Sequence, residues 1–333
     1  GLKSNVNTPR CSVEKSVARI VLKPTRRLTR FEMVSKKETC AFVVLTYNSG
    51  VFLENCLLSI MKLDCVDPYI YACDNGSTDD TARVLNSMSE RFPSRLSTIF
   101  NDKNEGTTKP RNDCIKAAIK SGRVFKYLII LDSDTIINSD AMSKMFAALE
   151  SDPSIGIVTP RMFNDRGVEQ MSVKKAPSLR TKFLKAFPSK AANSRGLARE
   201  KYEFFPGKDL TTTPPNGYVP LNGKLPSLKF SRDNSVYFGD YAISACWVMR
   251  MELIKKVGLL DEKYFYAPED ADYCACVYEH GLKVALVSGA SIFHLTQRLS
   301  KRKFFSKINL VHIFGLIRYA FKHANKPSTL SKK

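Results

Sequence analysis

The chain has 333 residues, enough to bury one large core or two, and its 44% hydrophobic and 25% charged residues are ordinary for a folded globular protein. This composition excludes a disordered chain, and no secretory signal or apolar segment of 20 residues is present. The net charge of +20 is unusual.

Basic residues gather in three segments, namely 1–39, 174–201 and 298–333. The first carries ten Lys or Arg against three acids, and the last carries ten against none. Such segments attract polyanions, either nucleic acid or the anionic face of a membrane, although solubility and basic tails account for them equally simply.

The nine cysteines show no paired spacing. Cys274 and Cys276 form the closest pair, and they lack the second Cys or His pair that a structural zinc site needs. Five others lie in or beside apolar segments, as reduced core thiols do: Cys40, Cys56, Cys65, Cys73 and Cys114. We therefore expect a reducing, cytoplasmic environment.

Strands and helices are predicted to alternate from Cys40 onward, after a basic arm over residues 1–39. The apolar patterns predict strands at 41–45, 69–73, 96–100, 127–131 and 155–159, and helices at 52–61, 79–88, 110–120 and 141–149. Such alternation predicts βαβ units, and hence an α/β fold around a mainly parallel, Rossmann-like sheet with flanking helices.

The alternation stops between residues 160 and 239, a basic stretch rich in Pro and Gly. It is too long for a simple loop, so we interpret it as a functional insertion on the acceptor side of the site. A strand over 241–250, a helix over 271–279 and a strand over 283–287 are predicted to follow. The domain is thus expected to span 40–296, as halves 40–159 and 240–296 around the insertion.

The tail 297–333 contains an amphipathic pattern. On a helix over 303–322, the basic residues Lys303, Lys307, Arg318 and Lys322 share one arc of about 100°, and apolar residues fill most of the rest. Such a helix suits the surface of an anionic membrane, or it packs its apolar side on the domain. Both readings stay open.

The segment 127–137 is the most informative, because an apolar run ends in two carboxylates, Asp132 and Asp134. Carboxylates at i and i+2 point to the same side of a strand, and the carboxyl ends of parallel strands are where open α/β sheets bind ligands. Two oxygen ligands suit Mg²⁺ or Mn²⁺. An Asp-rich turn after a strand is the plainer alternative.

Polar clusters follow three other predicted strands, at residues 46–49, 74–79 and 104–112. Each alone is explained by turn chemistry. In a parallel sheet, however, all these loops gather with Asp132 and Asp134 along one edge, which indicates a ligand site.

With these motifs the chain resembles the family 2 glycosyltransferases, which have the GT-A fold, and most of all their rhamnosyltransferase and galactofuranosyltransferase branch. The resemblance covers roughly 40–160 and 240–296, and it rests on an ordered series of motifs at 43–49, 73–81, 104–112, 131–134, 244–250, 257–265, 268–273, 281–287 and 291–294.

The resemblance implies a nucleotide-sugar donor, UDP- or dTDP-linked. Asp74 would accept the N3–H of the base, with Thr46 and Asn48 nearby. Lys109 and Arg111 are candidates for contact with the diphosphate. Asp132 and Asp134 would hold the metal and diphosphate, and His294 would complete the metal site; imidazole is an acceptable ligand for Mn²⁺ and a poorer one for Mg²⁺.

The resemblance also makes the Glu269–Asp270 pair the catalytic element, with Asp270 as the base and Glu269 as the fallback. Adjacent carboxylates raise each other's pKa, which helps a base act near neutral pH. An acidic helix N-terminus is the structural alternative. Asp240, Trp247 and Tyr266 are candidates for the acceptor side, although a core position explains a Trp equally well.

We therefore expect an inverting, metal-dependent glycosyltransferase that moves a rhamnose-like sugar or another hexose onto a lipid-linked glycan. It would be peripheral on the inner face of a bacterial cytoplasmic membrane. A sugar-1-phosphate nucleotidylyltransferase is disfavoured because no Gly-rich, Arg-containing loop follows the first strand. A non-enzymatic polyanion binder is permitted by the charge, but no nucleic-acid-binding motif is present.

Overall fold

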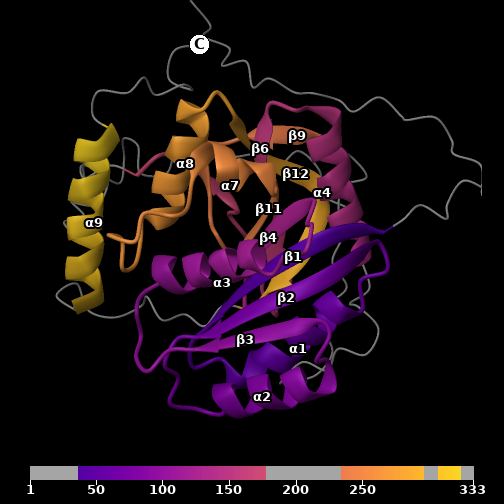
Figure 1. Ribbon diagram of the computed structural model, residues 1–333. Coiled ribbons are helices and arrows are strands. Elements are labelled where there is room, and N and C mark those ends of the chain that lie inside the picture. The colour runs from indigo at the N-terminus through magenta and orange to yellow at the C-terminus, as the bar shows by residue number, and fades with distance from the viewer. Residues whose placement is uncertain (1–36, 178–233, 296–306, 324–333) are drawn as a thin grey trace, which may run out of the picture.

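A computed structural model describes residues 37–177, 234–295 and 307–323. These residues form a central mixed sheet with helices on both faces (Figure 1), which confirms the predicted α/β class. Most of the predicted basic arm and residues 178–233 of the predicted insertion lie outside the described residues.

The predicted alternation of strands and helices is confirmed through the first half of the domain. The elements follow in the order β1 (Glu38–Thr46), α1 (Gly50–Met61), β2 (Val66–Asp74), α2 (Thr81–Arg91), β3 (Leu96–Phe100), α3 (Thr108–Lys120), β4 (Tyr127–Asp132), β5 (Thr135–Ile136), α4 (Ser139–Ser151) and β6 (Ile155–Phe163).

The second half departs from the expected single strand over 241–250. That segment forms β10 (Tyr241–Ala242) and β11 (Cys246–Arg250), which join different sheets. The later elements are α7 (Glu252–Val257), α8 (Glu269–Glu279), β12 (Lys283–His294) and α9 (Lys307–His323).

The sheet also continues into the stretch expected to be an insertion without regular structure. β6 runs on to Phe163, and three short strands follow: β7 (Glu169–Gln170), β8 (Val173–Lys174) and β9 (Val236–Phe238). β7 pairs with β6, and β9 pairs with β12. Strands of only two or three residues, in a stretch rich in Pro and Gly, have no apolar pattern from which they could be predicted.

The strand order β3-β2-β1-β4-β11-β6-β12-β5 explains where the site lies. β1, β2, β3 and β4 are parallel, so their carboxyl ends meet at one edge, whereas β11 runs antiparallel between β4 and β6. β12 is parallel to β6 and antiparallel to β5. The last residues of β12 therefore return to the loop that follows β4.

Two hydrophobic clusters cover the two faces of the sheet. Alternate residues of β1 point to opposite faces, with Phe42 and Val44 in one cluster and Ala41 and Val43 in the other. The first cluster takes side chains from α1, α2 and α4, and the second takes them from α3, α7 and α8. Burial on both faces explains the continuous apolar runs of the central strands.

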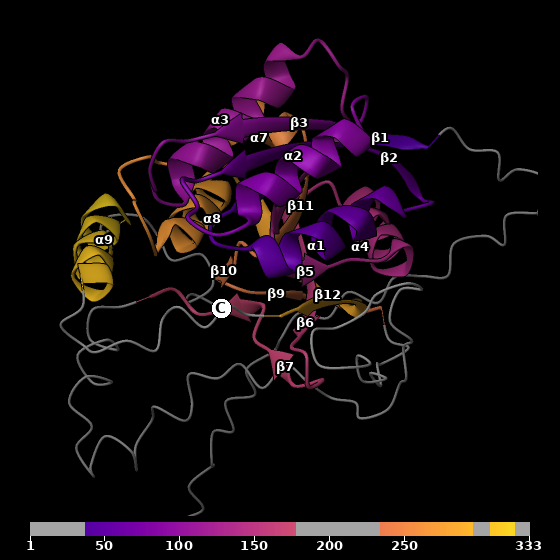
Figure 2. The ribbon, with the colours of Figure 1, turned by 90° about the horizontal axis from the view of Figure 1, so that it is seen from below.

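α9 lies at the edge of the molecule beside α8, as both ribbon views show (Figure 1 and Figure 2). Its observed span is close to the predicted 303–322, and it packs on the domain. Within the described part of the chain, no helix combines the length and hydrophobicity needed to cross a bilayer.

Candidate functional site

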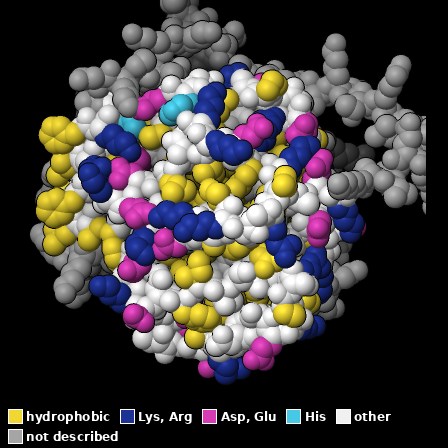
Figure 3. Space-filling model, viewed as in Figure 1, with side chains coloured by type: hydrophobic (Ala, Val, Ile, Leu, Met, Phe, Trp, Pro, Cys, Tyr) yellow, Lys and Arg dark blue, Asp and Glu magenta, His cyan; other side chains and the backbone are white. Residues whose placement is uncertain are grey.

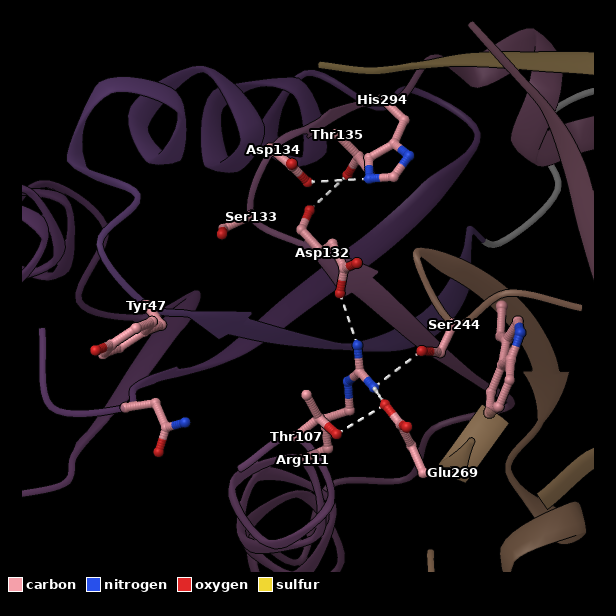
Figure 4. A network of polar contacts seen from close by, with 12 residues as sticks. Tyr47, Thr107, Arg111, Asp132, Ser133, Asp134, Thr135, Ser244, Glu269 and His294 are labelled. Carbon is pink, nitrogen blue, oxygen red and sulfur yellow. Dashed lines mark hydrogen bonds and ion pairs between the residues drawn. The ribbon is translucent and has the colours of Figure 1, made fainter. Parts of the chain in front are cut away.

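The two carboxylates of the Asp132-Ser-Asp134 segment meet a histidine at the end of β4 (Figure 4). β5 follows this segment directly and pairs with the end of β12, so that His294 stands opposite Thr135. The amide of Leu295 donates to the carbonyl of Asp134 at 2.8 Å and closes the arrangement. His294 Nε2 lies 3.4 Å from Asp134 Oδ1.

Gln170 holds the histidine from its other side. Its Oε1 lies 2.8 Å from His294 Nδ1, and its Nε2 donates to the His294 carbonyl at 2.9 Å. Because an amide oxygen only accepts, Nδ1 carries the proton in this contact, and Nε2 faces Asp134. No sequence pattern points to Gln170, because β7 is a two-residue strand.

The site concentrates negative charge in a buried place. Burial raises the pKa of Asp132, and the Asp134 charge raises it further, while the Arg111 charge opposes both. Burial lowers the pKa of His294, but its hydrogen bond with Asp134 and the charges of both aspartates outweigh burial and raise it. A cation in this place would relieve the repulsion between the carboxylates.

The donor set fits a divalent cation. Asp132, Asp134 and His294 each offer one ligand atom, and these atoms lie within 4.8 Å of one another. Two carboxylate oxygens and one imidazole nitrogen suit Mn²⁺ better than Mg²⁺. The residues predicted to ligate a metal are therefore brought together.

Arg111 connects this cluster to the start of α8. Its guanidinium is buried, donates from Nη2 to Asp132 Oδ1 at 2.7 Å, and donates from Nη1 to Ser244 Oγ at 2.9 Å. Nη1 also lies 3.6 Å from Glu269 Oε1 (Figure 4). A single arginine thus bridges the proposed metal-binding and catalytic carboxylates.

Glu269 and Asp270 form the first residues of α8. Glu269 is buried: its Oε1 accepts from Thr107 Oγ1 at 2.7 Å, and its Oε2 has no hydrogen-bond partner among the described residues. Burial raises the pKa of Asp270 to about 7, and the Glu269 charge adds to the shift. Asp270 therefore has the proton affinity of a base that works near neutral pH.

The residues expected at the nucleotide base gather at the ends of β1 and β2. Thr46 and Asp74 are partners in the parallel register, and the Thr46 hydroxyl is buried without a partner among the described residues. Asp74 Oδ1 accepts from the amide and the hydroxyl of Ser77. Asn48, at a positive φ of 49°, accepts from the amide of Thr78 at 2.8 Å.

Lys109 does not join the cluster. It lies two residues before Arg111 on α3, and residues so spaced point in nearly opposite directions on a helix. Its ammonium is paired with Glu105 at 2.6 Å and with Asp113 at 2.8 Å.

The three acceptor-side candidates, Asp240, Trp247 and Tyr266, have different surroundings. Trp247 is fully buried, stacks on Tyr273 with ring centroids 5.8 Å apart and donates to the Ala242 carbonyl. This burial favours the alternative core role for Trp247, and its contact with the acceptor stays a prediction. Tyr266 is partly exposed four residues before Asp270, and Asp240 accepts from the Ala176 amide.

Comparisons with known sequences agree with this architecture. Residues 41–205 match the family model described as Glycosyl transferase family 2. A poly-beta-1,6-N-acetyl-D-glucosamine synthase of Staphylococcus aureus is 30% identical over 139 residues, which are 40% of this chain and 32% of that protein. The Staphylococcus epidermidis enzyme of that name is 26% identical over 149 residues, 44% of this chain and 34% of its own. The chain thus spans about a third of the length of these relatives.

Solved structures resemble the fold at low sequence identity. GalNAc-T7, solved with UDP, GalNAc and Mn²⁺, superposes with a TM-score of 0.57 and 13% identity, over 86% of this chain and 48% of that one. The mannosyltransferase PcManGT from Pyrobaculum calidifontis, solved with GDP-Man and Mn²⁺, superposes with a TM-score of 0.50 and 13% identity, over 88% of this chain and 66% of that one. Together these likenesses show a GT-A-like fold, and residues 41–205 are similar to the glycosyl transferase family 2.

Proposed function

We propose that the chain is an inverting, metal-dependent glycosyltransferase that uses a UDP- or dTDP-linked sugar. The observation that carries the proposal is the connection that Arg111 makes from Asp132 to Glu269 beside Asp270, with the ligand atoms of Asp132, Asp134 and His294 within 4.8 Å of one another. Glycosyl transfer needs a place for a diphosphate and a base for a hydroxyl. The connection offers both within one edge of the sheet.

Asp132, Asp134 and His294 would hold the cation, and Gln170 would keep the imidazole in place. A divalent cation bound there would neutralise negative charge on the departing nucleoside diphosphate. Two glycosyltransferases of the same fold were solved with Mn²⁺ and a nucleotide or nucleotide sugar, which supports this assignment.

Asp270 would act on the acceptor. As the acceptor oxygen forms its bond to the anomeric carbon, the bond from that carbon to the diphosphate oxygen breaks. The hydroxyl proton passes to Asp270. A pKa of about 7 leaves Asp270 substantially ionised at neutral pH and still basic enough to take that proton. Arg111 and Thr107 would fix Glu269 beside it.

Thr46, Asn48 and Asp74 would form the binding site for the uracil or thymine ring. The buried hydroxyl of Thr46 has no partner in the described part of the chain, which favours a ligand contact because buried polar atoms are ordinarily hydrogen-bonded. Asp74 would accept the N3–H that both bases share.

We place the enzyme on the inner face of a bacterial cytoplasmic membrane, where it would extend a lipid-linked glycan by a rhamnose-like sugar or another hexose. The support for glycan synthesis is the relation to the staphylococcal poly-beta-1,6-N-acetyl-D-glucosamine synthases. The support for a membrane is the basic segment 298–333.

A thermal-shift screen of UDP- and dTDP-sugars, with and without Mn²⁺, tests the proposal most directly. We expect one donor to raise the melting temperature only when Mn²⁺ is present, and Asp134→Ala to lose that shift. Asp102→Ala, at an exposed carboxylate, is the control. A donor that stabilises both proteins equally without metal would contradict the metal-dependent reading.

Donor turnover tests the base. Asp270→Asn should lose transfer while keeping the donor-dependent thermal shift, because Asp270 would act on the acceptor. Undiminished transfer in Asp270→Asn would remove Asp270 from this role. Release of pyrophosphate from a nucleoside triphosphate and a sugar 1-phosphate would instead indicate a nucleotidylyltransferase.

A further inference from the structure

α9 exposes an apolar stripe on the outside of the molecule. Leu310, Phe314 and Phe321 are 46%, 69% and 82% exposed. With the partly buried Ile317 between them, these residues have the spacing i, i+4, i+7 and i+11, which places them along one side of a helix. Figure 3 shows hydrophobic side chains gathered at the left edge, where α9 lies.

The other side of α9 is fixed to the domain by ion pairs. Arg318 and Lys322 bind Asp261 at 2.7 and 3.2 Å, and Lys322 also binds the buried Asp272 at 2.7 Å. His323 lies 2.9 Å from Asp272. Leu316, also on α9, is buried. The helix therefore has one polar, docked side and one apolar, outward side.

α9 touches the segment that leads into the proposed catalytic carboxylates. At Gly315, a Cβ would lie 2.5 Å from the carbonyl oxygen of Ala267 and 2.9 Å from Pro268. Pro268 immediately precedes Glu269 and Asp270, the first residues of α8. Only glycine allows the helix to approach this closely.

The opposite side of the same segment rests on α3. Thr107 donates its amide to the Phe265 carbonyl at 2.8 Å, and Thr108 donates its hydroxyl to the Tyr264 carbonyl at 2.7 Å. Residues 258–268 are therefore held between α3, which carries Arg111, and α9, which carries the apolar stripe.

α9 also borders the acceptor-side candidates. Burial raises the pKa of Tyr319 on this helix, and the charges of Asp240 and Asp272 raise it further. Tyr266, another acceptor-side candidate, precedes the Ala267 that contacts Gly315.

The positive charge of the segment that contains α9 favours an anionic lipid surface as the partner of the apolar stripe. Residues 298–333 carry ten Lys or Arg and no acid, and eight of these remain besides Arg318 and Lys322, which pair with carboxylates of the domain. An exposed aromatic stripe on a helix within a purely basic segment matches an anionic lipid surface, which takes apolar side chains and cations together. A second copy of this chain, with its net charge of +20, would bring like charges together.

We propose that α9 lies in the surface of an anionic bilayer through Leu310, Phe314 and Phe321, and that this docking orders residues 258–268 and so sets Asp270 beside an acceptor carried by the lipid. The docking on the bilayer does not depend on the proposed function. The effect on Asp270 does depend on the proposed function, in which Asp270 is the base.

Vesicle flotation of the full chain tests the docking. The chain should float with vesicles of phosphatidylcholine and phosphatidylglycerol, and Phe314→Ser with Phe321→Ser should reduce the bound fraction by about tenfold or more. The matched control is Val124→Ser with Val168→Ser, which removes two apolar side chains that are 85% and 57% exposed away from α9. Neither pair touches the proposed donor or catalytic residues.

Two results would overturn the docking. One is equal flotation of the double phenylalanine variant and the control. The other is a parent chain that binds no vesicles and sediments as a dimer, while the double phenylalanine variant sediments as a monomer. That result would assign the stripe to a contact with a second copy of the chain.

Hydrogen exchange tests the coupling to residues 258–268 without any turnover. Vesicles should slow amide exchange across 258–272 in the parent chain by about tenfold. In the Gly315→Leu variant α9 keeps the apolar stripe but cannot approach Ala267 closely. This variant should still float with vesicles, while amide exchange across 258–272 stays fast. Unchanged exchange in the parent chain on vesicles would overturn the coupling. Neither flotation nor hydrogen exchange needs a donor. A failed transfer assay therefore does not affect the docking proposal, and failed flotation does not affect the proposed glycosyl transfer.

Discussion

A hydrogen bond of 2.7 Å joins the buried guanidinium of Arg111 to Asp132 at the carboxyl end of β4. The same guanidinium lies 3.6 Å from Glu269, which is far from Asp132 along the chain. Arg111 neutralises the buried Glu269 and the partly exposed Asp132, and its planar fork suits two partners at once.

Replacing Arg111 should therefore affect stability and catalysis together. Arg111→Ala leaves the buried Glu269 and the partly exposed Asp132 without their cation and should cost about 3 kcal/mol in the free energy of unfolding. Arg111→Lys keeps the charge but loses the fork, so it should fold and lose at least ~10-fold in kcat/KM. Denaturant titration and donor turnover measure the two effects.

Lys109→Ala is the matched control on the same helix. Its ion pairs with Glu105 and Asp113 are partly exposed, so its loss should change stability by less than about 1 kcal/mol and leave turnover near that of the parent chain. If Lys109→Ala and Arg111→Lys lowered turnover equally, the bridging role of Arg111 would be wrong.

Gln170 should act through His294 on metal affinity. Gln170→Leu removes the acceptor for Nδ1 and the donor to the His294 carbonyl, and partners of metal-binding histidines are typically worth 10–100-fold in affinity. We expect Mn²⁺ binding, measured by calorimetry or by the electron paramagnetic resonance of free Mn²⁺, to weaken by about that factor. Val168→Ser in the same hairpin is the control, and equal Mn²⁺ affinity in the two variants would show that Gln170 only supports the fold.

Most of the fold was predictable from the sequence, because burial on both faces gives the central strands unbroken apolar runs, such as 127–131. Asp132 and Asp134 were predictable from the end of this apolar run, whereas His294 came from the resemblance and is brought to them by the pairing of Thr135 with His294. The contact of Gln170 was not predictable, since a two-residue strand has no periodicity to detect. The burial of Trp247 was undecided for a different reason: one aromatic residue in a strand fits a core and a sugar site equally well.

The pH dependence of transfer should report Asp270. A base must be ionised to accept a proton, and burial raises the pKa of Asp270 to about 7. kcat/KM should therefore rise as the pH increases, level off above about 7, and show a single ionisation on the acidic side. Measurements at saturating Mn²⁺ keep the metal ligands loaded. A profile that is flat from about pH 5 to 8 would contradict Asp270 as the base.

The same shift predicts that Asp270 costs stability where it is ionised. The folded protein binds this proton more tightly than the unfolded chain does. The favourable contribution of protonated Asp270 to the free energy of unfolding is therefore fully present below about pH 4 and is lost as the pH rises through about 7. Asp270→Asn cannot ionise and should be more stable at pH 8 by on the order of 2 kcal/mol, with little gain at pH 4. Thermal unfolding at both pH values, with Asp102→Asn as the exposed control, measures this difference.

Trp247 and Tyr266 should respond to substitution in opposite ways. Trp247 is fully buried against Tyr273, so Trp247→Ala should cost about 3–5 kcal/mol in the free energy of unfolding. Tyr266 is 37% exposed near Asp270, so Tyr266→Ala should leave stability within about 1 kcal/mol and raise KM for the acceptor. Trp247→Phe separates packing from chemistry, because it keeps most of the aromatic volume. A fully stable Trp247→Phe with a raised acceptor KM would return Trp247 to the acceptor site, whereas an unchanged KM would leave the sugar-binding aromatic surface to Tyr266.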